Sequence, residues 1–307
     1  MKQIMFSFII PVFNAELYIQ NCVNSILNQK FNNLELILIN DGSTDSSGHI
    51  CDDYALNDRR IRVFHQENKG QGSARNLGLK HANGTYIIFV DSDDALAKNT
   101  LELNYQILEK DTSIECLQFP IFMKYGTEDA YIRKNIEKKY QLESNEFKKL
   151  ILEDNVISWI VCDKIFKRDS VKSLKFREDI KFEDNFFMME YVQNIKTFYS
   201  SDKGLYYYYF RADSTTTSKL SELKERSTLE VLYLILSFLN PKKECNTFYK
   251  FLIRLINVTK SLKVNFGLHY KNANFYSFRK HVNLGSVLKS GLPIKDIIKL
   301  ILYRIYG

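Results

Sequence analysis

Three carboxylates stand almost side by side in the sequence. Asp91, Asp93 and Asp94 directly follow the strand-forming residues Tyr86–Val90. Like charges this close repel one another, and they are costly to place where water is scarce. A divalent cation bridging a diphosphate would neutralise the cluster, because Mg²⁺ and Mn²⁺ are typically held by one or two carboxylates together with phosphates and waters. The pattern indicates such a site, with a solvated acidic turn as the alternative.

Two further segments carry groups that could act with these carboxylates. In GQGSARN, Gly70 and Gly72 permit close backbone approach to a ligand, and Arg75 offers a fixed positive charge. Arg75 would face a diphosphate or pair with the acidic cluster, and the two roles are compatible. KFEDNFF contains a second acidic pair, Glu183-Asp184. Taken alone, that pair favours an exposed acidic turn.

Four apolar segments of strand length would position these residues. Across the first 110 residues the sequence predicts strands at 6–12, 34–39, 61–65 and 85–90, separated by helices at 15–29, 44–54 and 73–82. Asn14 is placed to cap the first helix, and Thr44 or Asp45 the second. Strands that alternate with helices predict a parallel sheet covered on both faces. Because ligands bind outside the carboxyl ends of such strands, four strand ends should meet in one crevice: 11–14, 40–41, 65–72 and 91–94.

The pattern loosens beyond residue 110. Residues 115–125 predict one or two strands, 126–143 a charged excursion, 144–153 a helix and 205–210 another strand. From about residue 218 onward the signals are helical.

The composition is that of a globular protein with a sizeable core, with 307 residues of which 45% are hydrophobic and 26% charged. The N-terminal segment lacks a signal-peptide pattern, and no stretch reaches the roughly 18 apolar residues of a membrane span. Five widely spaced cysteines without a CxxC pair predict reduced thiols, with no disulfide framework or zinc site. A cytoplasmic protein is therefore expected.

Charge is unevenly distributed along the chain. Residues 219–307 hold sixteen Lys/Arg and five Asp/Glu, a net +11, which leaves −4 for the first 218 residues. A basic C-terminal region suggests contact with an anionic surface, with a solvated helical face as the alternative. Within it, Pro293–Ile305 predicts a basic amphipathic helix that could lie in an anionic membrane interface, pack on the catalytic domain or form a dimer seam.

Successive motifs in the first half carry a family resemblance. FIIPVFN, ILINDGSTDSS and ENKGQGSARNLGLKHANGTYIIFVDSDD resemble, in order and spacing, the signatures of glycosyltransferase family 2, the inverting nucleotide-sugar transferases with the GT-A fold. The resemblance implies an α/β fold over residues 1–217, Rossmann-like, with a mostly parallel central sheet flanked by helices. Its nucleotide-binding half would be 1–110 and its acceptor-side half 111–217. A basic, mainly helical region, 218–307, would follow.

The resemblance also implies which residues bind the nucleotide sugar: Pro11, Val12, Phe13, Glu16, Asp41, Arg75, Asp91 and Ser92. Among them, Asp41 would accept a hydrogen bond from a uracil N–H. Asp93, with help from Asp91, would hold Mn²⁺ or Mg²⁺. Asp94 would either cap a helix beside the site or take part directly.

Residues of the second half would supply the catalytic base and the acceptor contacts. Asp184 matches the family's general base, which inversion requires because the acceptor hydroxyl loses its proton as it attacks. Glu183, Trp159 and Arg211 are implied to contact the acceptor or the diphosphate. A core position for Trp159 and a packing role for Tyr206–Tyr209 are the alternatives.

Together these residues imply metal-dependent, inverting transfer of a sugar from a UDP-sugar to a hydroxyl of a saccharide or lipid-linked glycan, in bacterial surface polysaccharide or glycolipid synthesis. The expected partners are the donor, the acceptor, an anionic membrane surface on the inner face of the plasma membrane and a second copy of the chain, with no nucleic acid. Two alternatives stay open. A haloacid-dehalogenase-like phosphatase also uses DxD after a strand, but on the first core strand. A non-catalytic nucleotide-sugar-binding module would have lost activity, against which the intact Asp91, Asp93 and Asp184 argue.

Overall fold

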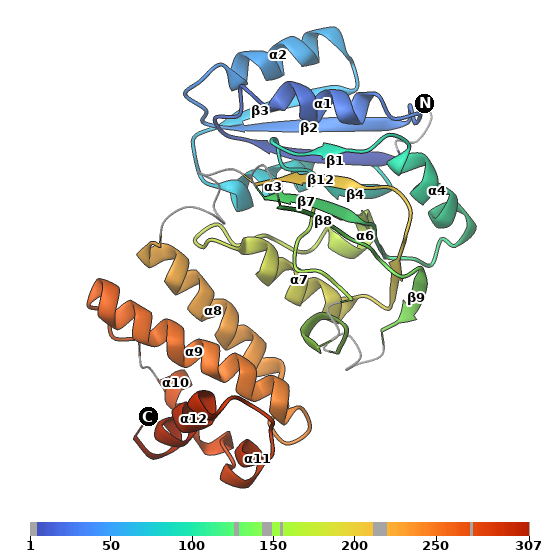
Figure 1. Cartoon of the computed structure of the whole chain (residues 1–307). Coiled ribbons are helices and arrows are strands. Elements are labelled where there is room, and N and C mark those ends of the chain that lie inside the picture. Colours follow the sequence, from blue (N-terminus) through green and yellow to red (C-terminus); the bar gives the residue numbers. More distant parts are fainter. Residues whose placement is uncertain are drawn as a thin grey trace. The chain divides into compact units, whose positions relative to one another are not determined.

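Four parallel strands build the first half of the central sheet. β1 (Phe6–Val12), β2 (Leu34–Asp41), β3 (Ile61–Gln66) and β4 (Tyr86–Phe89) lie in the order β3-β2-β1-β4, and each neighbouring pair is parallel (Figure 1). β1 and β2 are buried along their whole length, as continuous apolar runs predict for strands covered on both faces. The predicted strands are confirmed, and their carboxyl ends lie at one edge of the sheet.

The computed structural model describes residues 5–125, 129–142, 149–153, 156–210, 220–270 and 273–306. The chain divides into two compact units. The first comprises residues 1–178 and 183–218, and the second comprises 179–182 and 219–307.

Three helices connect the parallel strands: α1 (Ile19–Leu27), α2 (Ser47–Asn57) and α3 (Gln71–His81). The prediction that Asn14 caps α1 is wrong, because α1 begins five residues later. Asn14 instead adopts a φ of 47°, and its side-chain oxygen accepts a hydrogen bond from the Thr44 amide at 2.9 Å. The Ala15 amide donates to the Ser47 hydroxyl at 2.7 Å. These bonds join the loops that follow β1 and β2.

The second half of the sheet is mixed. β4 pairs antiparallel with β10 (Lys164–Lys167), and the sheet continues through β6 (Cys116–Gln118), β11 (Thr197–Ser200) and β9 (Lys138–Gln141). The predicted α/β architecture, a central sheet flanked by helices, is confirmed. Its first four strands are all parallel, and β6 and β11 also pair parallel.

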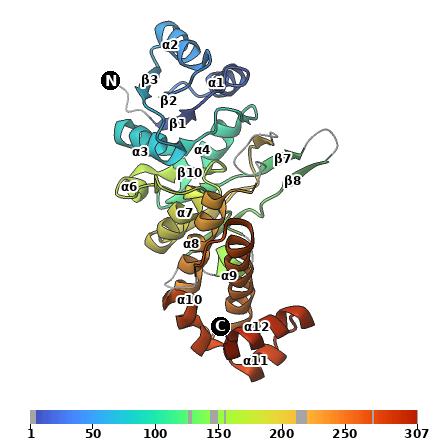
Figure 2. The same cartoon turned by 90° about the vertical axis from the view of Figure 1, so that its left-hand side faces the viewer.

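A smaller sheet has the order β5-β12-β7-β8, formed by β5 (Ala95–Leu96), β12 (Tyr206–Tyr209), β7 (Ile121–Tyr125) and β8 (Asp129–Arg133). β7 and β8 form a hairpin (Figure 2). α4 (Thr100–Lys110), a π-helical turn (Lys149–Glu153) and α6 (Arg168–Val171) complete the connections. The sequence predicted no strand in the segment that contains β8 and β9. Most of the helix predicted at 144–153 lies outside the described residues.

An aromatic cluster packs α7 (Glu183–Asn194) in the core of the first unit. The ring of Phe187 stacks on Phe176 with centroids 4.1 Å apart, and Phe89 meets both rings edge-on. Phe89 is the last residue of β4, two positions before Asp91. This packing places the acidic N-terminus of α7 near the carboxylates that follow β4.

The second unit is helical, as predicted. α8 (Glu222–Phe238) packs along α9 (Cys245–Phe266), followed by α10 (Ala273–Ser277), a 3₁₀ turn (Phe278–His281), α11 (Leu284–Leu288) and α12 (Ile294–Tyr306). α12 contacts α9, and its Leu300 and Tyr303 are buried. This side of α12 therefore packs within the second unit. Packing of the helix on the catalytic domain stays a prediction. In the segments that the structure covers, no helix has the length and apolarity to cross a membrane.

Candidate active site

Arg75 links two acidic segments that are far apart in the sequence. Its guanidinium is buried, with Nη2 donating to Asp91 Oδ1 at 2.9 Å and Nη1 to Glu183 Oε1 at 2.6 Å. The Arg75–Glu183 pair joins positions 108 residues apart. Burial alone would lower the pKa of Arg75, but the charges of Asp91 and Glu183 outweigh it and raise that pKa. Arg75 therefore stays charged, and the predicted pairing with the acidic cluster is present.

Gly72 allows α3 to approach the segment that precedes α7. A Cβ at this position would lie 2.4 Å from the backbone oxygen of Arg177. That distance is far too short for real atoms, so a larger residue would push the helix away. The guanidinium of Arg75, one turn further along α3, also lies 5.3 Å from the ring centroid of Phe176. The close packing of α3 against residues 176–177 therefore determines the position of the Arg75 guanidinium.

Asp91 is held by side chains from several elements. Its Oδ1 accepts a second hydrogen bond from Gln71 Nε2 at 2.7 Å, and its amide donates to the Tyr206 hydroxyl at 3.1 Å. The side chain of Asp91 is half-buried, as is Asp93, whereas Ser92 is buried. Asp91 Oδ2 has no hydrogen-bond partner among the described residues. This oxygen is available to a ligand.

The burial and hydrogen bonds of Asp94 indicate a structural role and not metal binding. It is only 1% exposed, and its Oδ2 accepts a hydrogen bond from the Tyr206 hydroxyl at 2.8 Å. Its Oδ1 accepts from the Tyr209 amide at 2.9 Å. Burial, together with the charges of Asp93 and Asp91, raises the pKa of Asp94 well above its usual range. The helix-capping alternative is wrong: Asp94 fixes β12 to the strand end. The sequence predicts only a packing role for Tyr206, but its hydroxyl accepts a hydrogen bond from the Asp91 amide and donates one to Asp94.

Asp184 lies in the first turn of α7, next to the ion-paired Glu183. It is half-buried, and its Oδ1 accepts a hydrogen bond from the Asn185 amide at 2.9 Å. Burial and the negative charge of Glu183 raise the pKa of Asp184 to about 7, against the opposing effect of Arg75. A carboxylate with a pKa near the working pH suits a general base.

The predicted nucleotide-binding residues lie at the ends of β1 and β2. Pro11 and Val12 are buried in β1, whereas Phe13 is 46% exposed. Glu16 is exposed, and its Oε2 accepts a hydrogen bond from the Ser46 amide at 3.0 Å. The structure thus brings these residues to the same edge as Asp91.

Asp41 is engaged by the loop that follows β3. Its Oδ1 accepts hydrogen bonds from Gln66 Nε2 at 2.7 Å and from the Lys69 amide at 2.9 Å, and its Oδ2 accepts from the Gly70 amide at 2.9 Å. The carboxylate is buried and orders the loop that leads into α3. The predicted hydrogen bond from Asp41 to a base stays a prediction.

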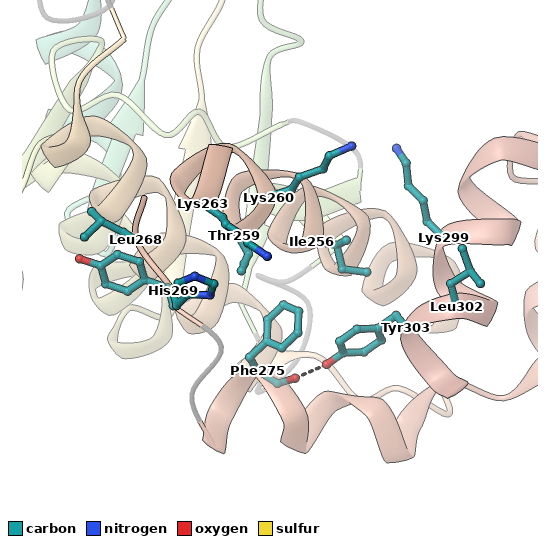
Figure 3. A pocket seen from close by; sticks show the side chains of 11 residues that line it. Ile256, Thr259, Lys260, Lys263, Leu268, His269, Phe275, Lys299, Leu302 and Tyr303 are labelled. Atoms are coloured by element: carbon teal, nitrogen blue, oxygen red, sulfur yellow. Dashed lines mark hydrogen bonds between the residues drawn. The ribbon is translucent and has the colours of Figure 1, made fainter. Parts of the chain in front are cut away.

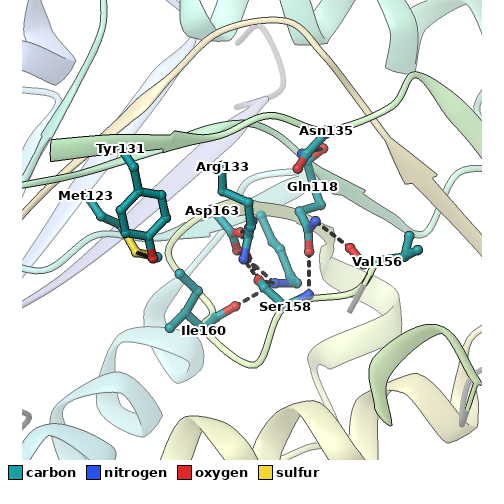
Figure 4. A network of polar contacts seen from close by, with 10 residues as sticks. Gln118, Met123, Tyr131, Arg133, Asn135, Val156, Ser158, Ile160 and Asp163 are labelled. Carbon is teal, nitrogen blue, oxygen red and sulfur yellow. Dashed lines mark hydrogen bonds and ion pairs between the residues drawn. The ribbon is translucent and has the colours of Figure 1, made fainter. Parts of the chain in front are cut away.

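Trp159 is half-buried in a loop that a buried polar network holds (Figure 4). Lys164 Nζ donates to Asp163 Oδ1 at 2.7 Å and to the Ser158 hydroxyl at 2.6 Å, and both charged side chains are fully buried. Burial lowers the pKa of Lys164 and would raise that of Asp163, which the charges of Lys164 and Arg133 lower instead. No pattern in the sequence predicts this network. Arg211 lies outside the described residues.

The donor atoms present suit a hard divalent cation. In the described part of the chain, no group of three or more His, Cys, Asp or Glu side chains is arranged to hold a metal ion. A Mg²⁺ held by one or two carboxylates takes its other ligands from phosphates and waters. Asp91 Oδ2 and the carboxylate of Asp93 fit such a site, which a diphosphate would complete.

Comparisons with known proteins identify the family of this chain. Residues 7–174 match the family described as Glycosyl transferase family 2. The chain is 34% identical over 215 residues to the uncharacterized glycosyltransferase EpsJ of Bacillus subtilis, covering 68% of this chain and 62% of EpsJ. It is 33% identical over 223 residues to the minor teichoic acid biosynthesis protein GgaB of Bacillus subtilis, covering 71% of this chain and 24% of GgaB. The chain thus spans less than two thirds of either relative.

A solved structure shares the fold. S. aureus TarS 1-349, crystallised in complex with UDP-GlcNAc, superposes with a TM-score of 0.71 at 22% identity, covering 98% of this chain and 90% of that one. This likeness confirms the predicted GT-A fold. The match over residues 7–174 covers more than half of the chain and speaks against the phosphatase alternative. The chain belongs to glycosyltransferase family 2.

Proposed function

We propose that this protein transfers a sugar from a UDP-sugar to a hydroxyl of a saccharide or lipid-linked glycan, with inversion at the anomeric carbon. The observation that carries the proposal is the Arg75 bridge, which brings the strand-end Asp91 together with Glu183, the neighbour of Asp184. TarS in complex with UDP-GlcNAc supports a UDP-sugar donor, and the name of GgaB supports a surface polymer as the acceptor.

The donor would bind at the carboxyl ends of β1, β2 and β4. Phe13 is exposed enough to contact the base, and Asp41 would accept its N–H. Asp93 and Asp91 would hold Mn²⁺ or Mg²⁺ against the diphosphate. The bound ion would neutralise charge that develops on the leaving UDP.

Asp184 would take the proton of the acceptor hydroxyl. As the acceptor oxygen forms its bond to the anomeric carbon, the bond from that carbon to the diphosphate oxygen breaks on the opposite face. The proton moves to the Asp184 carboxylate, and UDP leaves with the bonding electrons. A pKa of about 7 keeps much of Asp184 ionised and still basic at neutral pH.

Trp159, Glu183 and Arg211 are proposed at the acceptor or diphosphate side. Glu183 would act mainly through its ion pair with Arg75, which positions Asp184. The protein would work in the cytoplasm, at the inner face of the membrane, in bacterial surface polysaccharide or glycolipid synthesis. The basic C-terminal helices would contact the membrane. As a second proposal, the same helices would join two copies of the chain in a dimer.

A panel of UDP-sugars tests the proposed donor. Incubated with Mn²⁺ and no acceptor, the protein is expected to release UDP from one or a few UDP-sugars, because water can take the place of the missing acceptor hydroxyl. Released UDP is measured in a coupled assay, with the Asp184→Asn variant as the control. UDP binding without release from any donor, and without transfer to any saccharide, would instead favour a non-catalytic binding module.

Metal dependence is tested by UDP binding. For the wild type, Mn²⁺ is expected to raise the affinity for UDP about tenfold or more, because Asp93 would hold the ion and its positive charge would attract the diphosphate. Asp93→Ala should lose this gain, whereas Asp169→Ala, which changes an exposed carboxylate of α6, should keep it. Isothermal calorimetry with and without Mn²⁺ measures the difference. Equal UDP affinity under all conditions would refute the metal assignment.

A further inference from the structure

The second unit contains a pocket of about 390 Å³ between α9 and α12 (Figure 3). Its apolar lining comes from both helices and from the segment between them: Ile256, Leu268, Phe275, Leu302 and Tyr303. The Tyr303 hydroxyl donates to the backbone oxygen of Phe275, which ties α12 to α10. A volume of this size accommodates a small ligand or part of a larger one.

Three lysines line the same pocket: Lys260 and Lys263 of α9 and Lys299 of α12. The side chains of Lys260 and Lys299 extend toward the same side of the pocket (Figure 3). Lys299 Nζ lies 3.2 Å from Asp296 Oδ1, whereas neither Lys260 nor Lys263 forms an ion pair within the described segments. From residue 245 to 307 the sequence holds eleven Lys/Arg and a single acidic residue. The pocket therefore suits a ligand that is anionic at one end and apolar at the other.

An exposed apolar stripe of α12 adjoins the pocket. Ile294, Ile298, Leu302 and Ile305 recur at spacings of four, four and three, so they share one side of the helix, and each is about half exposed or more. Leu302 belongs to both the stripe and the pocket lining. A surface that is apolar and flanked by lysines matches a membrane interface that contains anionic headgroups.

We propose that this pocket binds the phosphate head of an anionic membrane lipid, while the α12 stripe lies in the interface. Lys260 and Lys299 would contact the phosphate, and the first carbons of the lipid chain would lie against Leu302 and Tyr303. This inference deepens the membrane part of the proposed function. A lipid held here would keep the enzyme at the surface where a lipid-linked acceptor is found.

Vesicle co-sedimentation of the full chain tests the site. The wild type is expected to sediment with vesicles of phosphatidylglycerol and phosphatidylcholine, and not with phosphatidylcholine alone. Lys260→Gln with Lys299→Gln should weaken binding about 25-fold, about fivefold for each lysine. Lys242→Gln with Lys243→Gln removes the same charge from the exposed turn between α8 and α9 and should have little effect. Equal loss in both double variants would mean diffuse attraction and would overturn the pocket.

Two further measurements separate a lipid from other occupants. Monomeric dioctanoyl phosphatidylglycerol should bind by calorimetry, and glycerol phosphate should not; equal binding would reduce the site to one for free phosphate. Leu302→Gln should weaken vesicle binding, whereas Leu223→Gln, which changes an exposed leucine of α8, should not. If Leu302→Gln instead splits a dimer of a protein that never binds vesicles, the stripe is a dimer seam and the lipid proposal fails. Transfer to a soluble acceptor should be unchanged in every variant, so this test stands apart from that of the sugar transfer.

Discussion

The Asp184→Asn variant is expected to lose about 10²–10⁴-fold in the rate of sugar transfer while it binds UDP nearly as well as the wild type. The amide has the shape of the carboxylate but cannot take the acceptor proton. Transfer is measured with the UDP-sugar and acceptor that the wild type uses, and UDP binding by calorimetry. A variant that keeps most of its transfer rate would remove Asp184 from the mechanism.

The pH dependence gives the same prediction a second readout. Because Asp184 must be ionised, wild-type kcat/KM should rise about tenfold for each pH unit below about 7 and then level off. Glu183→Gln should move this inflection to lower pH, since Glu183 raises the pKa of Asp184. An inflection that stays in place would show that another group sets it.

The ionisation of Asp184 that raises activity as the pH increases should lower the stability of the folded protein. The pKa of Asp184 is about 7 in the folded protein and about 3.9 in an unfolded chain, so the fold favours the protonated form. The stabilisation that protonation provides is complete below the unfolded pKa and is lost as the pH rises through the folded pKa. Asp184→Asn lacks this loss and should therefore melt higher than the wild type at pH 8 but not at pH 4. Such a result would also show that the inactive variant is folded.

Arg75→Met is expected to lower the free energy of unfolding by about 3–5 kcal/mol. The substitution leaves Asp91 and Glu183 close together, in a largely buried site, without the charge that compensates them. Urea unfolding can be followed by the fluorescence of Trp159, the single tryptophan, which lies in the same unit. A loss of this size is a large part of the stability of a typical domain.

Two control variants define what the loss means. Lys172→Met breaks an exposed pair with Asp169 in the same unit and should cost less than about 1 kcal/mol. Arg75→Lys keeps the charge but lacks the planar fork that reaches two carboxylates at once, so it should fall between these values. If Arg75→Met is no less stable than Lys172→Met, the bridge does not hold the two acidic segments together.

The sequence predicts the parallel strands well because their physics is local. β1 and β2 are buried on both faces and therefore appear as continuous apolar runs. β9 is an edge strand of the large sheet with mostly exposed side chains, and β8 lies at the edge of the small one. Neither carries a run of buried residues, so the sequence pattern predicts a charged loop at 126–143 and misses both strands. The sequence does not show that Asn14 binds the loop after β2, because its partners Ser43 and Thr44 are about 30 residues away.

The candidate site was predicted in its residue types but not in its connections. Asp91, Asp93 and Asp184 stand in recognisable motifs, so the sequence names them. The Arg75–Glu183 pair and the Asp94–Tyr206 hydrogen bond join residues 108 and 112 positions apart, and only the folded chain brings them together. The raised pKa of Asp184 likewise depends on burial and on neighbours that only tertiary packing supplies. The motifs therefore identify the residues, and only the folded structure shows their hydrogen-bond partners and their protonation.

The stereochemistry of transfer tests the central proposal most directly. With the active UDP-sugar, whose α- or β-configuration is known, the product formed at early times is examined by proton NMR through the coupling constant of its anomeric proton. Direct attack by an acceptor hydroxyl that Asp184 deprotonates predicts a product of the opposite anomeric configuration to the donor. A product that retains the donor's configuration would contradict a single displacement, and with it the role proposed for Asp184.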